Sequence, residues 1–302
     1  MKKPNFFIIG SVKCGTTTLY SYLQQSPQVF MPVQKEPHYF IRQDHDLVYQ
    51  GPKDDLFFVK YPESIFDYEQ LFKDVKNESL VGEASTMYMV YKGVANRLFE
   101  YNSEAKIIAL IRNPIERAFS HYLHHIREGT VIAKSFNQAI KEELAGKRDT
   151  WAPQRRYIEI GKYADQLKQY LSVFPVEQLL ILKFEDFIVS PNEALSEVSE
   201  FLGIENIFHE KEIKKHNASG VPKNDKIHSF YLKSLRFSRR VFPFLTHSPL
   251  SKLRKKIDNI YRNNFLKKPK LDNETRELLR LVYKEEIDSI KEITGLDLSN
   301  WN

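Results

Sequence analysis

The sequence predicts an α/β protein built in three layers, with a central, mostly parallel sheet and helices on both faces. Three short apolar runs, residues 5–10, 106–111 and 178–183, have the length and composition of buried strands. Segments with helical spacing lie between and after these runs. Strands that alternate with helices favour parallel pairing in a sheet that is covered on both sides.

The first strand and the helix after it enclose a glycine loop. The run at 5–10 (NFFIIG) ends at Gly10, and apolar residues after Gly15 recur at helical spacing until Pro27 stops the pattern. A strand, a glycine loop and a helix in this order form the opening of an α/β unit.

The second strand, residues 106–111 (KIIALI), leads into a helix with clear end signals. Asn113 and Pro114 suit the N-cap and the first helical position, and Glu116 stands where it would complete a capping box. Gly129 suits the C-terminal cap. We therefore expect a helix from Pro114 to the residue before Gly129.

The third strand, residues 178–183, lies between two further helix patterns, at 163–174 and 191–202. Residues 41–78 are rich in aromatic, proline and charged residues, which predicts an irregular excursion. The C-terminal residues have the pattern of a charged helix. We expect a single domain over residues 1–302.

The composition excludes several classes of protein. With 42% hydrophobic residues among 302, the chain can bury a substantial core. Its single cysteine excludes an internal disulfide and a cysteine-based metal cluster, which favours a reducing compartment. No apolar run approaches the roughly 18 residues that a membrane-spanning helix requires. We therefore expect a cytoplasmic protein without a bound metal.

Positive charge is concentrated in one part of the chain. The net charge is +6, but residues 211–270 hold 17 Lys and Arg against 3 Asp and Glu. This asymmetry indicates an anionic partner, although solvated helix faces would give the same pattern. Within this part, residues 225–270 predict a basic, amphipathic helical segment, which can lie on a membrane surface or contact an anionic glycan.

The loop at residues 10–18 (GSVKCGTTT) has the features of an anion site. It precedes a helix N-terminus, where backbone N–H groups and the helix dipole favour phosphate. Gly10 and Gly15 have the separation of a Walker A motif, but Thr16 follows them and the lysine lies inside the loop, as Lys13. No Walker B acid follows the second strand. The loop therefore predicts a P-loop-type fold that binds a 5′-phosphate without ATPase chemistry.

Two motifs resemble those of sulfotransferases that use 3′-phosphoadenosine 5′-phosphosulfate (PAPS). The loop at 10–18 resembles the family's 5′-phosphosulfate loop, and residues 111–122 (IRNPIERAFSHY) resemble its 3′-phosphate signature. Residues 35–40 (KEPHYF) and 217–223 resemble the branch that contains heparan sulfate sulfotransferases and many bacterial enzymes. Ala84 replaces a lysine of the heparan sulfate enzymes. The resemblance covers most of the chain.

This resemblance implies transfer of a sulfuryl group from PAPS to a hydroxyl or amine, with 3′-phosphoadenosine 5′-phosphate (PAP) as the second product and no metal. Lys13 would neutralise charge on the leaving phosphate, and either Glu36 or His38 would be the general base. Eleven residues would hold the nucleotide: Lys13, Cys14, Gly15, Thr16, Thr17 and Thr18 in the loop, Arg112 and Ser120 in the 3′-phosphate signature, and Ser219, Gly220 and Lys223.

The helix expected after Arg112 also contains three histidines and a second arginine. His121, His124 and His125 form a histidine-rich stretch without cysteines or carboxylates at metal spacing, which predicts core or acceptor-pocket residues rather than metal ligands. We expect Arg117 to be a structural ion-pair partner.

Two other functions stay open on the sequence alone. A P-loop kinase for a small metabolite would use the glycine loop, and a non-enzymatic module that binds RNA or glycan would use the basic residues 211–270. No specific nucleic-acid signature is present. The acceptor of a sulfotransferase could be a glycan, a lipid-linked sugar or a secondary metabolite. By analogy with the family, we expect a bacterial, cytoplasmic enzyme, with peripheral membrane contact through the basic segment.

Overall fold

The computed structural model describes residues 3–42, 49–52, 54, 61–206, 221–224, 227–229, 231, 233–234, 261, 266–267 and 269–301. Its centre is a five-stranded sheet in the order β2-β3-β1-β4-β5, in which every pair of neighbours is parallel. The strands are β1 (Phe6–Ile8), β2 (Val29–Phe30), β3 (Leu80–Ala84), β4 (Lys106–Ile111) and β5 (Leu179–Lys183). The three predicted strands are confirmed as β1, β4 and β5.

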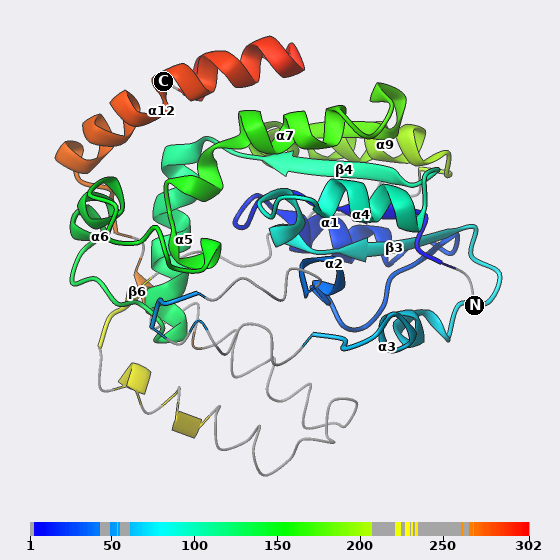
Figure 1. Ribbon diagram of the computed structural model, residues 1–302, viewed down its shortest axis with the longest axis horizontal. Helices are drawn as coiled ribbons and strands as arrows, with labels where there is room; N and C mark the ends of the chain where they lie inside the picture. The colour runs from blue at the N-terminus through cyan, green and yellow to red at the C-terminus, as the bar shows by residue number, and fades with distance from the viewer. Residues whose placement is uncertain are drawn as a thin grey trace.

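Helices follow or connect these strands (Figure 1). Their bounds are α1 (Thr16–Leu23), α2 (Tyr39–Arg42), α3 (Ile65–Glu69), α4 (Val94–Tyr101), α5 (Pro114–Glu128), α6 (Phe136–Leu144), α7 (Tyr163–Leu171), α8 (Phe184–Val189), α9 (Pro191–Leu202) and α12 (Asn273–Thr294). A separate antiparallel pair joins β6 (Val221–Pro222) to β7 (Leu266–Lys267).

Alternate residues of the central strands face two hydrophobic cores. In β4, Ile107, Ala109 and Ile111 pack into one core with residues of α4, α5, α7 and α12. The intervening Ile108 and Leu110 pack into the other core with residues of α1 and α9. Because both faces are buried, these strands are apolar throughout rather than alternating. The predicted three-layer α/β architecture is confirmed.

The long C-terminal helix α12, orange to red in Figure 1, packs on the outside of α5, α6 and α7. It begins at the N-cap Asp272, whose side chain accepts a hydrogen bond from the Thr275 N–H, and ends at Gly295 in the left-handed region. This confirms the C-terminal charged helix. Among the described residues, no helix has both the length and the apolar character needed to cross a bilayer.

Helix α5 has the predicted bounds, but its capping differs from the prediction. The Asn113 side chain accepts hydrogen bonds from the backbone N–H groups of Ile115 and Glu116, and Gly129 ends the helix in the left-handed region. The Asn113 N–H, however, donates to Glu185 Oε1 at 3.0 Å, and Glu116 instead pairs with Arg276 at 2.8 Å. A carboxylate from another strand end thus replaces Glu116, so the predicted capping box was wrong.

Other boundaries were only partly predicted. Helix α7 ends at Leu171, three residues before the predicted end, and α9 has the predicted bounds. The excursion at 41–78 is not wholly irregular, since Ser64 and Asp67 form a capping box at the start of α3. Most of the basic segment 225–270 lies outside the described residues.

Candidate functional site

The loop between β1 and α1 is shaped by glycine at its entry and by left-handed backbone inside it. A Cβ on Gly10 would lie 2.2 Å from the backbone nitrogen of Leu110, so only glycine allows this approach of β1 to β4. Lys13 has φ of 71° and Gly15 has φ of 89°. Gly15 is the N-cap of α1 and provides no side chain to cap its N–H groups. The start of α1 can therefore offer backbone donors to an anion.

The Cys14 side chain points into the core rather than toward an anion. It is fully buried, and its Sγ lies 4.0 Å from the Tyr163 hydroxyl. Burial raises the pKa of the Cys14 thiol to about 12, so the thiol stays protonated at neutral pH. Only the backbone of Cys14 could contact a nucleotide. Thr16 is buried, whereas Thr17 and Thr18 are half-buried on the first turn of α1.

The two motifs predicted to bind anions meet at the carboxyl edge of the sheet. Arg112 follows β4, and its Nη1 donates a hydrogen bond to the Lys13 carbonyl oxygen at 3.1 Å. The guanidinium also lies over the Phe184 ring, 4.6 Å from its centroid. Ser120 is buried two turns into α5. In open α/β sheets, ligands bind at this edge, where the parallel strands end.

The C-terminal tail closes against the same strand ends. Trp301 is fully buried; its Nε1 donates to Glu185 Oε2 at 3.2 Å, and its carbonyl accepts from Asn113 Nδ2 at 3.0 Å. Glu185 therefore bridges Trp301 and the Asn113 N–H. This clasp fixes the residue next to Arg112. Sequence reasoning did not assign a role to Glu185, because its partners lie 72 and 116 residues away in the sequence.

A second loop, which contains Glu36 and His38, is attached to the end of β3. The Glu36 N–H donates to the Ala84 carbonyl at 2.9 Å, and the His38 N–H donates to Ser85 Oγ at 3.1 Å. Glu36 and His38 have φ of 60° and 53°. With Lys13, they are the non-glycine residues at positive φ in the described part of the chain. Left-handed backbone costs a non-glycine residue about 1 kcal/mol or more, and such strain concentrates at functional sites.

The Glu36 carboxylate has two basic partners. Lys35 Nζ lies 2.6 Å from Oε1, and His38 Nε2 lies 3.5 Å from Oε2. Burial alone would raise the pKa of Glu36, but the Lys35 ammonium and the hydrogen bond from His38 outweigh it and hold this pKa well below its usual range. The Glu36 side chain keeps 39% of its exposure, whereas His38 keeps 6%. Glu36 is thus an accessible carboxylate, and His38 is enclosed.

Beneath this loop lies a buried carboxyl that sequence reasoning did not identify. Glu83 of β3 is fully buried and accepts a hydrogen bond from the Tyr68 hydroxyl at 3.0 Å. Burial raises the pKa of Glu83 to about 7. Two nearby hydroxyl groups bind the loop. The Ser85 hydroxyl accepts a hydrogen bond from the His38 N–H, and the Tyr88 hydroxyl accepts one from the Phe40 N–H at 3.3 Å.

Glu36 and His38 face a cavity of about 680 Å³. Helix α5 contributes all three of its predicted pocket histidines to the lining. The described lining residues are Val12, Gln34, Lys35, Glu36, His38, Tyr61, Thr86, Met87, His121, His124, His125 and Gln154. Among the residues that the structure describes, no group of three or more His, Cys, Asp and Glu could hold a metal ion.

All three histidines have depressed pKa values. Burial lowers the pKa of His124 and of His125 to about 3, helped by cations that include Lys13. Burial and neighbouring cationic groups also hold the pKa of His121 well below its usual range. The histidines are therefore neutral at physiological pH, and Lys13 is close enough to α5 to affect each of them.

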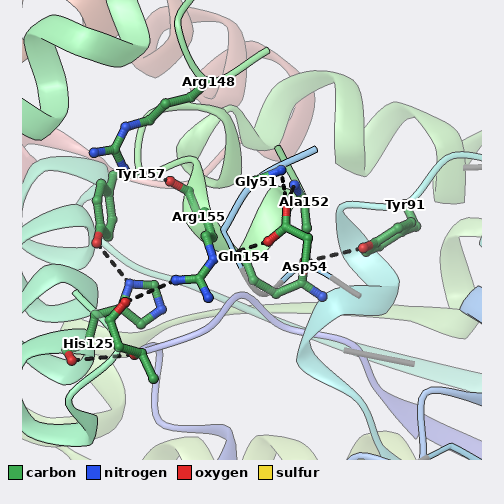
Figure 2. A network of polar contacts seen from close by, with 10 residues as sticks. Gly51, Asp54, Tyr91, His125, Arg148, Ala152, Gln154, Arg155 and Tyr157 are labelled. Carbon is green, nitrogen blue, oxygen red and sulfur yellow. Dashed lines mark hydrogen bonds and ion pairs between the residues drawn. The ribbon is translucent and has the colours of Figure 1, made fainter. Parts of the chain in front are cut away.

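The wall of the cavity around Gln154 is supported by a polar network (Figure 2). The fully buried Asp54 accepts hydrogen bonds from the N–H groups of Gly51 and Ala152 and pairs with Arg155 Nε at 3.1 Å. The Tyr91 hydroxyl donates to Gln154 Oε1 at 3.2 Å. No local pattern predicts these pairs, because Asp54 and Arg155 are 101 residues apart.

The remaining predicted residues are Ser219, Gly220, Lys223 and Arg117. Ser219 and Gly220 lie outside the described residues. Lys223 is exposed directly after β6, which packs against α5. Arg117 is fully buried, and its guanidinium donates to the main-chain carbonyl of Tyr157; no carboxylate among the described residues forms the predicted ion pair with it.

The sequence of this chain is similar to those of known sulfotransferases. A family model described as "Sulfotransferase domain" matches residues 3–291. Human heparan sulfate glucosamine 3-O-sulfotransferase 3B1 is 28% identical over 220 residues, covering 72% of this chain and 51% of that protein. The membrane-associated sulfotransferase kil1 of Dictyostelium discoideum is 24% identical, covering 78% and 63% of the two chains.

A solved structure matches along the whole chain. The sulfotransferase from Alicyclobacillus acidocaldarius superposes with a TM-score of 0.75 at 28% identity, covering 100% of this chain and 99% of that one. By contrast, the chain spans about half the length of the human relative. Because the family model covers nearly all of the sequence, the chain belongs to the sulfotransferase family.

Proposed function

We propose that this protein transfers a sulfuryl group from PAPS to an acceptor hydroxyl or amine. The hydrogen bond from Arg112 to the Lys13 carbonyl carries the proposal, because it joins two anion-binding motifs that are 99 residues apart. A nucleotide with phosphates at both its 5′ and 3′ positions would use both motifs at once. Family membership supports the same donor.

The nucleotide would be held by residues at the edge where the strands end. Backbone N–H groups at Gly15 and Thr16 and the threonine hydroxyls of α1 would bind the 5′-phosphate. Arg112 and Ser120 would bind the 3′-phosphate, with the guanidinium as a charged fork. Lys13 would stabilise charge that develops on the oxygen between sulfur and phosphorus. Roles for Ser219, Gly220 and Lys223 in this site remain predictions.

Because it opens on the cavity, Glu36 is favoured over His38 as the general base; Lys35 and His38 lower its pKa, so the acceptor hydroxyl would have to displace one of these partners from the carboxylate. Glu36 opens on the cavity, whereas His38 is enclosed and directs Nε2 at the Glu36 carboxylate. In the proposed step, the acceptor oxygen bonds to sulfur and gives its proton to Glu36. The bond from sulfur to the phosphate oxygen breaks, and PAP leaves with the electron pair. His38 would act as a positioning residue that orients the carboxylate.

A glycan or a small hydroxylated molecule is the acceptor class we favour. The similar human enzyme is named for a glucosamine of heparan sulfate, and mouse carbohydrate sulfotransferase 15 is 28% identical over 256 residues. A bacterial, cytoplasmic location and peripheral membrane contact of residues 225–270 remain predictions.

Transfer of radioactive sulfur from labelled PAPS tests this function. We expect product with at least one member of a panel of glycosides, phenols and amines, and a loss of at least 100-fold in kcat for Glu36→Gln. The matched control is Glu177→Gln, an exposed glutamate outside the site, which should keep wild-type turnover. Absence of transfer to every acceptor, or equal turnover in Glu36→Gln, would overturn the proposal.

A further inference from the structure

The cavity beside Glu36 has little net charge among its described lining residues. Lys35 and Glu36 line the cavity and form an ion pair with each other at 2.6 Å. Most of the other lining side chains are uncharged hydrogen-bonding groups, namely Gln34, Tyr61, Thr86, Gln154 and the three neutral histidines of α5. The remaining histidine, His38, directs Nε2 at the Glu36 carboxylate. A volume of about 680 Å³ is within the range of small-ligand sites.

The arginines behind this wall are engaged with carboxylates. Arg148 Nη2 lies 2.7 Å from Glu142, Arg155 Nε lies 3.1 Å from Asp54, and Arg127 Nε lies 3.2 Å from Glu128. All three arginine side chains are at most 8% exposed. In Figure 2, Arg155 is directed at Asp54, and its other visible contact is with a main-chain oxygen. Among the described residues, this wall therefore lacks the open cationic fork that binds a carboxylate or sulfate ester.

His124 is fixed as a hydrogen-bond donor. Arg127 Nη2 lies 2.8 Å from His124 Nδ1. A guanidinium can only donate, so Nδ1 must accept, and the neutral ring must carry its proton on Nε2. Burial and the adjacent cations Lys13 and Arg127 keep the ring neutral, with a pKa of about 3. His124, which lines the cavity, can thus donate through Nε2 and carries no charge.

Hydrogen bonds from neighbouring residues hold Gln154 and His125 in the adjacent part of the wall. The Gln154 amide oxygen is bound by Tyr91, and the backbone of this segment is held by Asp54 through the Ala152 N–H (Figure 2). His125 Nδ1 and the Tyr157 hydroxyl are 2.8 Å apart. Binding-site side chains that are fixed in this way favour ligands that match their donors and acceptors, because little ordering is required.

Resting on the proposed sulfotransferase function, we propose that this cavity is an acceptor subsite for an uncharged, hydroxyl-rich group of the size of a sugar ring. His124 holds one acceptor oxygen through its Nε2–H, while Glu36 accepts the proton of the hydroxyl that reacts. Hydroxyl groups can both donate to the carboxylate and accept from the imidazole. A carboxylate in the same place would meet Glu36 and find no unpaired cation among the described wall residues.

Matched acceptors test the charge preference. We would measure kcat/KM for sulfuryl transfer from PAPS to the p-nitrophenyl glucoside and galactoside, and to the corresponding glucuronide and galacturonide. The proposal predicts at least a tenfold preference for the neutral member of each pair. Equal or greater transfer to the uronides, or transfer to neither class by a protein that binds PAP, would overturn the subsite.

Variants of His124 test its role as a donor. His124→Ala should raise the KM for the neutral glycoside at least tenfold and leave PAP affinity unchanged, and His124→Gln, which retains an N–H donor, should recover part of the loss. Gln169→Ala, at a half-buried polar residue of α7 outside the cavity lining, is the control and should keep the wild-type KM. An unchanged KM in His124→Ala would contradict the assignment. If the wild-type protein did not bind PAP at all, the proposed function itself would be refuted.

Discussion

The side chain of Arg112 donates a hydrogen bond to the main-chain carbonyl of Lys13, over 3.1 Å. The two residues follow neighbouring parallel strands, β4 and β1. Lys13 is in the left-handed region, so its carbonyl direction depends on a backbone conformation that lysine rarely adopts. The contact therefore links the residue proposed for the 3′-phosphate to the backbone that carries the proposed catalytic amine.

Replacing Arg112 by lysine should weaken PAP binding more than 5′-ADP binding. Lysine keeps the charge but loses the planar fork and the link to Lys13. Hydrogen bonds to charged groups contribute about 1.5–3 kcal/mol, which corresponds to roughly a 10- to 100-fold loss in affinity. Calorimetric titration of both nucleotides measures the difference. An equal loss for PAP and 5′-ADP would show that Arg112 does not recognise the 3′-phosphate.

Removal of the Lys13 amine should slow turnover without abolishing nucleotide binding. Lys13→Ala should lower kcat by about 10²- to 10³-fold, the range found when one transition-state donor is lost. Lys13→Gly should lose as much activity but be the more stable variant, because glycine tolerates a φ of 71°. Single-turnover kinetics and thermal unfolding test both statements. The exposed Lys141→Ala serves as the control, and a Lys13→Ala enzyme with wild-type kcat would exclude the assigned role.

Glu83→Gln should change how stability depends on pH. The folded protein keeps the Glu83 proton up to about pH 7, whereas the unfolded chain releases it near pH 4.5. The wild-type free energy of unfolding should therefore fall, relative to Glu83→Gln, as pH rises through this window. A pKa difference of this size between the folded and unfolded states changes the free energy of unfolding by about 3 kcal/mol. Urea unfolding at pH 5 and pH 8 measures it, and a difference between the two proteins that does not vary with pH would contradict the raised pKa.

Truncation of Trp301 should destabilise the protein and loosen the 3′-phosphate motif. Trp301→Ala removes a fully buried ring and the donor to Glu185, at a cost of about 3–5 kcal/mol. Leu281→Ala on α12, where the leucine is 77% exposed, should cost less than about 0.5 kcal/mol. Chemical denaturation compares the two variants. Equal stabilities would show that the C-terminal clasp does not support the fold.

Local sequence signals were sufficient for the parts of the fold with short-range causes. The apolar run of β4 and the end signals of α5 are read from adjacent residues, and both elements have the predicted bounds. Strand β3 was not predicted, because Gly82 and Glu83 interrupt its apolar pattern. Gly82 is required there by packing, since a Cβ would meet the Phe6 ring at 2.1 Å. That contact joins residues far apart in sequence.

In the site, too, short-range sequence signals identified some residues, whereas others depend on the three-dimensional structure. Lys13 and Arg112 lie in contiguous motifs at predicted strand ends, so their proximity follows from the parallel order of β1 and β4. Gln154 could not be identified, because its significance comes from a contact with Tyr91, 63 residues away. Arg127 was missed although it lies only three residues from His124 on the same helix. The preference for Glu36 over His38 as general base also depends on which side chain opens on the cavity.

Calorimetric titration of the purified protein with PAP, 5′-ADP and magnesium-ATP tests the central claim most directly. The account predicts that PAP binds more tightly than the other two nucleotides, without a requirement for magnesium, and that Arg112→Ala abolishes this preference. A preference for magnesium-ATP would support the kinase alternative, and the absence of nucleotide binding would support the polyanion-binding one. Either result would contradict the assignment of this strand edge to a 3′,5′-bisphosphorylated nucleotide.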